Sequence, residues 1–185
     1  MKIRCIWAQD DLNIKYHDYE WGIPQHNDEK LFEFLVLEGA QAGLSWSTIL
    51  KRREGYAKAF SNFDPVKVSK YTSKQIKKLL VNREIIRNKL KINSAVRNAK
   101  HFLEIQNEFG SFDKYIWSFV NHKPIINNFK KFSDLPASSP ISEKISKDLK
   151  TRGFNFVGPT ICYAFMQAIG MVNDHTVDCF MKKSI

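Results

Sequence analysis

The sequence predicts an all-α protein, and three observations indicate this class. Apolar residues recur at helical spacing along most of the chain. No segment sustains an alternation of apolar and polar residues, and no Asn-Gly or Asp-Gly pair marks a hairpin between strands. Hydrophobic residues make up 43% of the 185 residues, enough for the core of a single domain over residues 1–185.

Start and stop signals divide the chain into helices. The first helix begins at Asp28 as its N-cap, and the next begins at Ser45 after a turn at Gly43. A long amphipathic helix stops at Gly110. Prolines and serines over 122–140 predict a surface loop, and both ends of the chain are expected to be irregular. The helices expected are 28–43, 45–60, 73–80, 85–110, 112–121, 141–152 and 159–171.

The charge pattern leaves several kinds of partner open. The net charge of +10 fits nucleic acid, an anionic membrane surface or merely a lysine-rich composition, and the lysines are spread along the chain. Charged residues at 26% exclude a disordered chain or a membrane protein. The first residues carry no signal-peptide pattern, so we expect a cytoplasmic protein. Three cysteines there argue against a disulfide framework.

Two Cys/His pairs stand at opposite ends of the chain. Cys5 and His17 form one pair; His175 and Cys179 form the other and would share one face of a helix. Together they make a Cys₂His₂ set that suits a closed, structural zinc site, which would join segments 5–17 and 175–179 and activate no water. The alternative is that the thiols pack separately, as expected for Cys162, and that the histidines are unrelated.

The segment "LKTRGFNFVGPTICYAF" predicts a hairpin between two helices within 141–171. Gly153 suits a left-handed helix end, and Pro159 suits a first helical position after Gly158. The segment resembles the helix-hairpin-helix motif, in which such a hairpin holds a DNA backbone phosphate without reading sequence. An ordinary pair of antiparallel helices is the alternative.

Glu38 lies in register with Leu31, Phe34 and Leu35, which are expected to face inward. A buried carboxylate is costly unless it is paired, so either an internal salt bridge or a ligand-binding cavity is indicated. Aromatic residues suited to stack on a flipped purine accompany it: Trp7, Tyr16, Trp21 and Trp46.

The segments "YHDYEWGIP", "LFEFLVLEGAQAGLSWSTILKRRE", "FDPVKV", "WSFVN" and "RGFNFVGPTICYAFMQAIGMVNDH" resemble the 3-methyladenine DNA glycosylase I family. The resemblance runs from Cys5 to Cys179. It implies a helix-hairpin-helix glycosylase fold and one structural zinc on the four Cys and His residues. It also implies hydrolysis of the N-glycosidic bond of 3-methyladenine in double-stranded alkylated DNA, releasing the free base and leaving an abasic site. No exposed heptad pattern suggests an oligomer, so a monomer is expected.

The resemblance also implies roles for single residues. Glu38 accepts hydrogen bonds from the base, Trp46 stacks on it, Tyr16 adds a polar contact, and Trp7 and Trp21 complete the pocket. The residues expected at the DNA are Gly43 and Leu44, as a wedge, and Gly153, Phe156, Gly158 and Thr160.

Two positions depart from the family pattern. Asn13 stands where a second pocket tyrosine is expected, and Asp11 where proline is usual. Asn173 stands where many other glycosylases with the hairpin motif carry a catalytic aspartate. No lysine that could form a Schiff base is evident near the hairpin, so no lyase reaction is expected. A binding module without activity, or a glycosylase that also takes 7-methylguanine or 3-methylguanine, remains an alternative. Repulsion between Glu38 and a guanine O6 favours adenine.

Overall fold

The computed structural model describes residues 2–183, which are mostly helical with one very small sheet. Its elements are α1 (Asp11–Tyr19), α2 (Asp28–Gln41), α3 (Trp46–Leu50), α4 (Arg53–Ala59), η1 (Ser61–Phe63), α5 (Pro65–Ser69), α6 (Ser73–Val81), α7 (Lys89–Phe109), α8 (Phe112–Ser118), β1 (Ile125–Ile126), η2 (Phe132–Asp134), α9 (Pro140–Thr151), α10 (Pro159–Ala168), β2 (Val172–Asn173) and η3 (Phe180–Lys183). Within this range no helix has the length and apolar character needed to cross a membrane.

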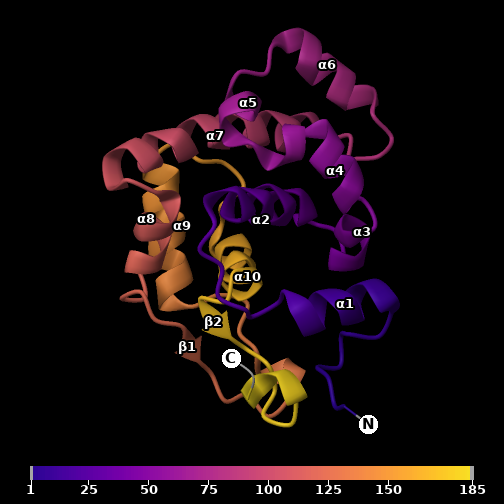
Figure 1. Ribbon diagram of the computed structural model, residues 1–185, viewed down its shortest axis with the longest axis vertical. Helices are drawn as coiled ribbons and strands as arrows, with labels where there is room; N and C mark the ends of the chain where they lie inside the picture. Colours follow the sequence, from indigo (N-terminus) through magenta and orange to yellow (C-terminus); the bar gives the residue numbers. More distant parts are fainter. Residues whose placement is uncertain (1, 184–185) are drawn as a thin grey trace.

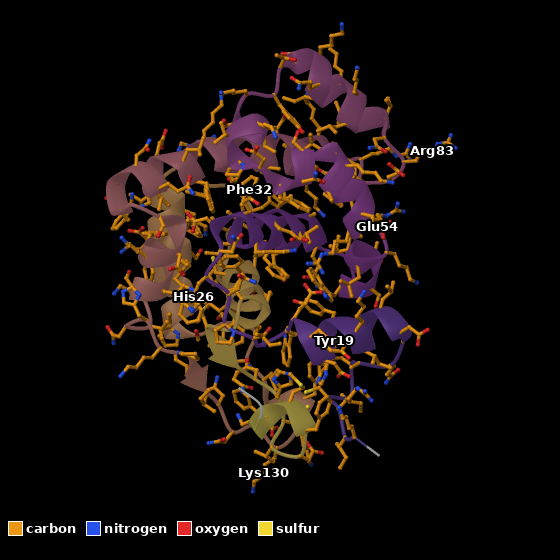
Figure 2. The ribbon with its side chains drawn as sticks, in the orientation of Figure 1. Tyr19, His26, Phe32, Glu54, Arg83 and Lys130 are labelled. Atoms are coloured by element: carbon orange, nitrogen blue, oxygen red, sulfur yellow. The ribbon has the colours of Figure 1, made fainter. Side chains whose placement is uncertain are left out.

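Helix α2 is the central element, with α7 above it and α10 below it in Figure 1. Residues 31–40 are all buried, because the helix is apolar on nearly every side. Phe32 lies between α2 and α7 (Figure 2) with its ring 5.2 Å from that of Phe102. This central position places Glu38 inside the molecule.

The two ends of the chain meet at the lower end of the molecule (Figure 1). The Phe180 amide donates to the Ile3 carbonyl at 2.9 Å. The two short strands pair in parallel, Ile125 with Val172 and Ile126 with Asn173. These two-residue strands are the small sheet that the sequence prediction did not include.

Several predicted boundaries are wrong. The N-terminal arm is not wholly irregular, because residues 11–19 form α1, which Asp10 caps. The predicted 45–60 helix is broken at Lys51 and Arg52 into α3 and α4. The predicted 85–110 helix begins at 89, where Asn88 caps it. Asn27, and not Asp28, is the N-cap of α2, whereas the Ser45 cap is confirmed.

Candidate functional site

A cavity of about 480 Å³ opens between α1, α2, α3 and α10, with residues of the 127–139 segment along one side. Its walls are aromatic and apolar except for a few polar side chains. The lining residues are Trp7, Asn13, Tyr16, Trp21, Glu38, Gln41, Trp46, Ser47, Phe132, Leu135, Pro136, Ala137, Ala164 and Gln167. All five residues predicted to hold a base are therefore in one place.

Glu38 is the single carboxylate among the lining residues of this cavity in the described chain. Its side chain is only 4% exposed, and Oε2 is buried without a hydrogen-bond partner. No salt bridge to Glu38 forms within residues 2–183, so the salt-bridge alternative is wrong. Burial raises the pKa of this carboxyl to about 8. Buried polar groups are nearly always hydrogen-bonded, so an unpartnered carboxyl beside a cavity requires an explanation.

Two aromatic pairs form the walls beside Glu38. The rings of Tyr16 and Trp46 are 5.1 Å apart, and those of Trp7 and Trp21 are 5.0 Å apart and meet edge to face. The indole Nε1 of Trp46 is buried without a partner. Burial, with the nearby Glu38 charge, raises the pKa of Tyr16 well above its usual value, so its phenol keeps its proton. The cavity thus offers flat faces together with donors and an acceptor.

Asn13 lines the cavity and joins two of its walls. Its side-chain amide donates to Asp10 Oδ2 at 2.8 Å and to Ser47 Oγ at 2.7 Å. Because Asp10 lies at the start of α1 and Ser47 on α3, the amide ties these helices together. At this position the sequence departs from the family pattern, and a short polar side chain takes the place expected for an aromatic one.

Several lining residues were not predicted from the sequence. Gln41 and Ser47 lie one turn from Glu38 and beside Trp46, so helical spacing could have found them. Phe132 and Leu135 come from the predicted surface loop, and no local pattern places that loop over the cavity. Gln167 is brought in by α10.

Neither Asn173 nor Asp174 lines the cavity. The Asn173 Oδ1 atom lies 3.0 Å from His175 Nδ1. Asp174 is buried and accepts hydrogen bonds from three side chains, which are Asn127, Tyr163 and Gln167. Asp174 therefore closes a structural network, and the cavity holds no second carboxylate among the described residues.

Three of the four predicted metal ligands gather where the chain ends meet. The ligand atoms of Cys5, His17 and Cys179 lie within 4.8 Å of one another, and all three residues are buried. The His17 Nε2 atom is 3.3 Å from Cys179 Sγ. Its Nδ1 atom is 2.8 Å from Asp18 Oδ1, and Asp18 also binds the Arg4 guanidinium. A carboxylate on the outer ring nitrogen is the usual arrangement behind a metal-binding histidine.

His175 lies beside this group but outside the three that converge. Its ring centroid is 4.9 Å from that of His17, and its Nε2 atom is buried without a partner. The expectation that His175 and Cys179 share a helix face is wrong, since they flank a turn in which the Cys179 amide donates to Thr176. Burial lowers the pKa of His175 to about 3, which keeps it neutral.

The predicted hairpin connects α9 and α10. Gly153 has a φ of +94° and packs so closely that a Cβ would lie 2.7 Å from His101 Nε2. Phe156 has a positive φ of 55° and packs against Gly39 of α2, next to Glu38. Asn98 of α7 holds the hairpin by bonding both the amide and the carbonyl of Asn155.

The part of the hairpin that leads into α10 is accessible to solvent. Gly158 precedes α10 as its N-cap, with nothing within 4 Å of a Cβ placed there. Thr160 is exposed in the first turn of α10. Backbone N–H groups at the start of a helix, when no side chain covers them, are suited to binding an anion.

The turn between α2 and α3 is also exposed. Gly43 has a φ of +76° with open space around it, and the Leu44 side chain is 39% exposed. Lys91 of α7 donates to the carbonyls of Ala40 at 2.8 Å and Ala42 at 2.6 Å. The lysine therefore holds the end of α2 and presents Gly43 and Leu44 to solvent beside the cavity.

A model of the methyladenine glycosylase family matches residues 7–182. The chain belongs to this family. It is 49% identical over 177 residues to DNA-3-methyladenine glycosylase 1 of Escherichia coli K12, with 95% of each chain covered.

Solved structures of this glycosylase family share the fold. A crystal structure of 3-methyladenine DNA glycosylase I superposes with a TM-score of 0.94 at 47% identity and covers 96% of this chain and 98% of its own. A Staphylococcus aureus structure that concerns recognition of 3-methyladenine has the same TM-score at 38% identity, over 97% of this chain and 96% of its own. The family resemblance is confirmed.

Proposed function

We propose that this chain is a DNA-3-methyladenine glycosylase, which hydrolyses the N-glycosidic bond of 3-methyladenine in alkylated double-stranded DNA. The observation that carries the proposal is the unpartnered carboxyl of Glu38 at the base of an aromatic cavity. The recognition of 3-methyladenine by the S. aureus relative supports the choice of base.

The cavity suits a base flipped out of the duplex. The Trp46 ring provides a face for stacking, and Glu38 accepts hydrogen bonds from the amino group of the adenine. The Tyr16 phenol and the Trp46 indole N–H supply donors. The positive charge of the methylated base favours the ionised form of Glu38. A guanine would present its O6 acceptor to that carboxylate, so adenine is preferred.

The bond that breaks joins the base nitrogen to C1′ of the sugar, and the oxygen of water forms the new bond at C1′. Methylation at N3 makes the base cationic within the nucleotide, so it leaves as a neutral molecule without prior protonation. The cavity contributes by holding the cation against Glu38 and aromatic faces, away from water. No lysine lines the cavity in the described chain, which supports a hydrolase without lyase activity.

The exposed backbone around the hairpin supports a helix-hairpin-helix contact with DNA. We propose that Gly153, Phe156, Gly158 and Thr160 place the start of α10 against a backbone phosphate. Gly43 and Leu44 occupy the space that the flipped nucleotide leaves in the stack.

A structural zinc fits the residues at the chain ends. Cys5, His17 and Cys179 supply three converging atoms, and the unpartnered Nε2 of the neighbouring His175 would supply the fourth. Burial raises the pKa of the Cys5 thiol to about 12, so a thiolate there needs a cation beside it. The zinc joins 5–17 to 175–179 and takes no part in the reaction.

We propose that residues 1–185 form one domain and that the protein acts as a monomer in the cytoplasm. Its partner is duplex DNA, and its product is the free base. Gel filtration with and without duplex DNA tests the monomer.

The activity is tested by incubating methylated duplex DNA with the protein and separating the released bases chromatographically. Wild type is expected to release 3-methyladenine and little 3-methylguanine. Glu38→Gln is expected to be impaired, while Glu29→Gln, an exposed glutamate on the same helix, retains activity. Retained DNA binding without release of any base would instead indicate a binding module.

A further inference from the structure

A second hollow, of about 600 Å³, lies on the far side of α3 from the base cavity. Three of its seven lining residues are arginines: Arg52, Arg83 and Arg87. No carboxylate lines it within residues 2–183, and neither Arg83 nor Arg87 forms an ion pair with a described residue. Three arginines at one depression concentrate positive charge there, and an anion would offset that charge.

The turn that carries two of these arginines is held firmly. A Cβ at Gly55 of α4 would lie 2.5 Å from the Glu84 carbonyl, so only glycine lets the turn approach this closely. The Ile86 amide donates to Tyr56 Oη at 3.2 Å. The Arg52 guanidinium donates to the Arg83 carbonyl at 2.9 Å. The hollow is therefore preorganised, which lowers the entropic cost of binding.

The helix that begins at the hollow adds to its positive potential. Asn88 lines the hollow and is the N-cap of α7, a helix of 21 residues. The N-terminus of a helix carries a partial positive charge and free backbone amides. Arg83 projects from the edge of the molecule in Figure 2, so a large anion has access.

The hollow has a fixed place relative to the base cavity. Trp46 at the start of α3 lines the cavity, and Arg52 just beyond the end of α3 lines the hollow. The short helix α3 and the two residues after it therefore connect the cavity to the hollow. Lys91, one turn after Asn88, also ties this region to the exposed turn at Gly43.

We infer that this arginine hollow binds a backbone phosphodiester of the DNA a short distance along the strand from the flipped base. The inference rests on the proposed function only in taking DNA as the ligand. The hollow reads no sequence, because guanidinium contacts to phosphate carry none. It fixes the position of the duplex so that the lesion lies over the cavity.

The test measures affinity for a duplex with one tetrahydrofuran abasic site, by fluorescence anisotropy over a series of salt concentrations. Arg83→Ala/Arg87→Ala is compared with Lys114→Ala/Lys123→Ala, which removes two exposed positive charges on or just after α8, at the opposite side of Figure 1. The arginine variant is expected to bind about tenfold more weakly and to lower the slope of log K against log salt by about one. The lysine variant is expected to change neither.

Truncated duplexes locate the contact. Cutting back one of the two DNA arms to about two base pairs from the lesion is expected to weaken wild type but to have little further effect on the arginine variant. Equal loss in both proteins, or an unchanged salt slope, overturns the inference. Base release from methylated DNA reports separately on the proposed function. If the protein releases no base but still shows the arginine-dependent salt slope, the phosphate site at the hollow stands and the proposed glycosylase activity does not.

Discussion

Two buried carboxyls, Glu38 and Asp174, differ in their partners. Asp174 accepts hydrogen bonds from three side chains, and its network joins β1, α10 and β2. Glu38 has a buried oxygen without a partner, and burial raises its pKa to about 8. A satisfied buried carboxylate stabilises the fold, whereas an unsatisfied one costs stability that only a ligand recovers. The difference separates structural from functional groups within one protein.

The largest effect is expected at the proposed zinc site, where His175 Nε2 is another buried atom without a hydrogen-bond partner. Cys179→Ser removes one of three converging ligands and is expected to abolish metal binding and to lower the unfolding free energy by about 5 kcal/mol. Elemental analysis and chemical denaturation measure the two. Cys162→Ser is the control, because that buried thiol lies outside the cluster. A wild-type protein free of metal and fully stable would contradict the zinc proposal.

Asp174→Ala removes the buried carboxyl that accepts hydrogen bonds from three side chains. The substitution leaves three buried donors without their acceptor, so we expect the unfolding free energy to fall by about 3 kcal/mol. Chemical denaturation measures the loss. A protein as stable as wild type would show that the network contributes nothing.

The pH dependence of the unfolding free energy tests the cost of burying the unpartnered carboxyl of Glu38. A carboxyl whose pKa is raised on folding adds no penalty below its usual pKa of 4.5, and the penalty is complete above about pH 8. Wild type should therefore lose stability relative to Glu38→Gln by about 1.4 kcal/mol for each unit that the pH rises within this window. Denaturation of both proteins at several pH values measures the difference, and a constant difference would show that Glu38 titrates normally.

The smallest effects come from two glycines of the hairpin. Gly153→Ala is expected to cost about 1–2 kcal/mol, because its positive φ and the nearby His101 ring disfavour a side chain. Gly158→Ala is expected to change stability by less than about 0.5 kcal/mol, since a Cβ there meets nothing. Its affinity for duplex DNA should fall several-fold. Unchanged DNA affinity in Gly158→Ala would remove the hairpin from the proposed DNA contact.

Much of the fold was predictable from sequence because its signals are local. The long helices α2 and α7 follow from periodicity, and α7 stops at Gly110 as expected, where the backbone is in the left-handed conformation. Helix α1 was missed because its buried residues include Asn13 and His17, which give it no apolar face. Ile85 continued the apolar pattern of α7 although it lies in the preceding turn.

The candidate site was predictable where one residue contradicted its surroundings. Glu38 stood out on an apolar helix, and the structure places it in the cavity with all four predicted aromatic residues. The contributions of Phe132 and of the arginine hollow could not be predicted. They depend on contacts between distant segments, such as Gly55 with Glu84, which no local pattern records.

The most direct test of the central claim is calorimetric titration of free 3-methyladenine into wild type, Glu38→Gln and Asp174→Asn. We expect Glu38→Gln to weaken binding by about tenfold or more, since its amide replaces an acceptor that the base uses. Asp174→Asn should bind the base as wild type does, even if it is less stable. Equal affinity of wild type and Glu38→Gln would contradict the claim that the unpartnered carboxyl is kept for the base.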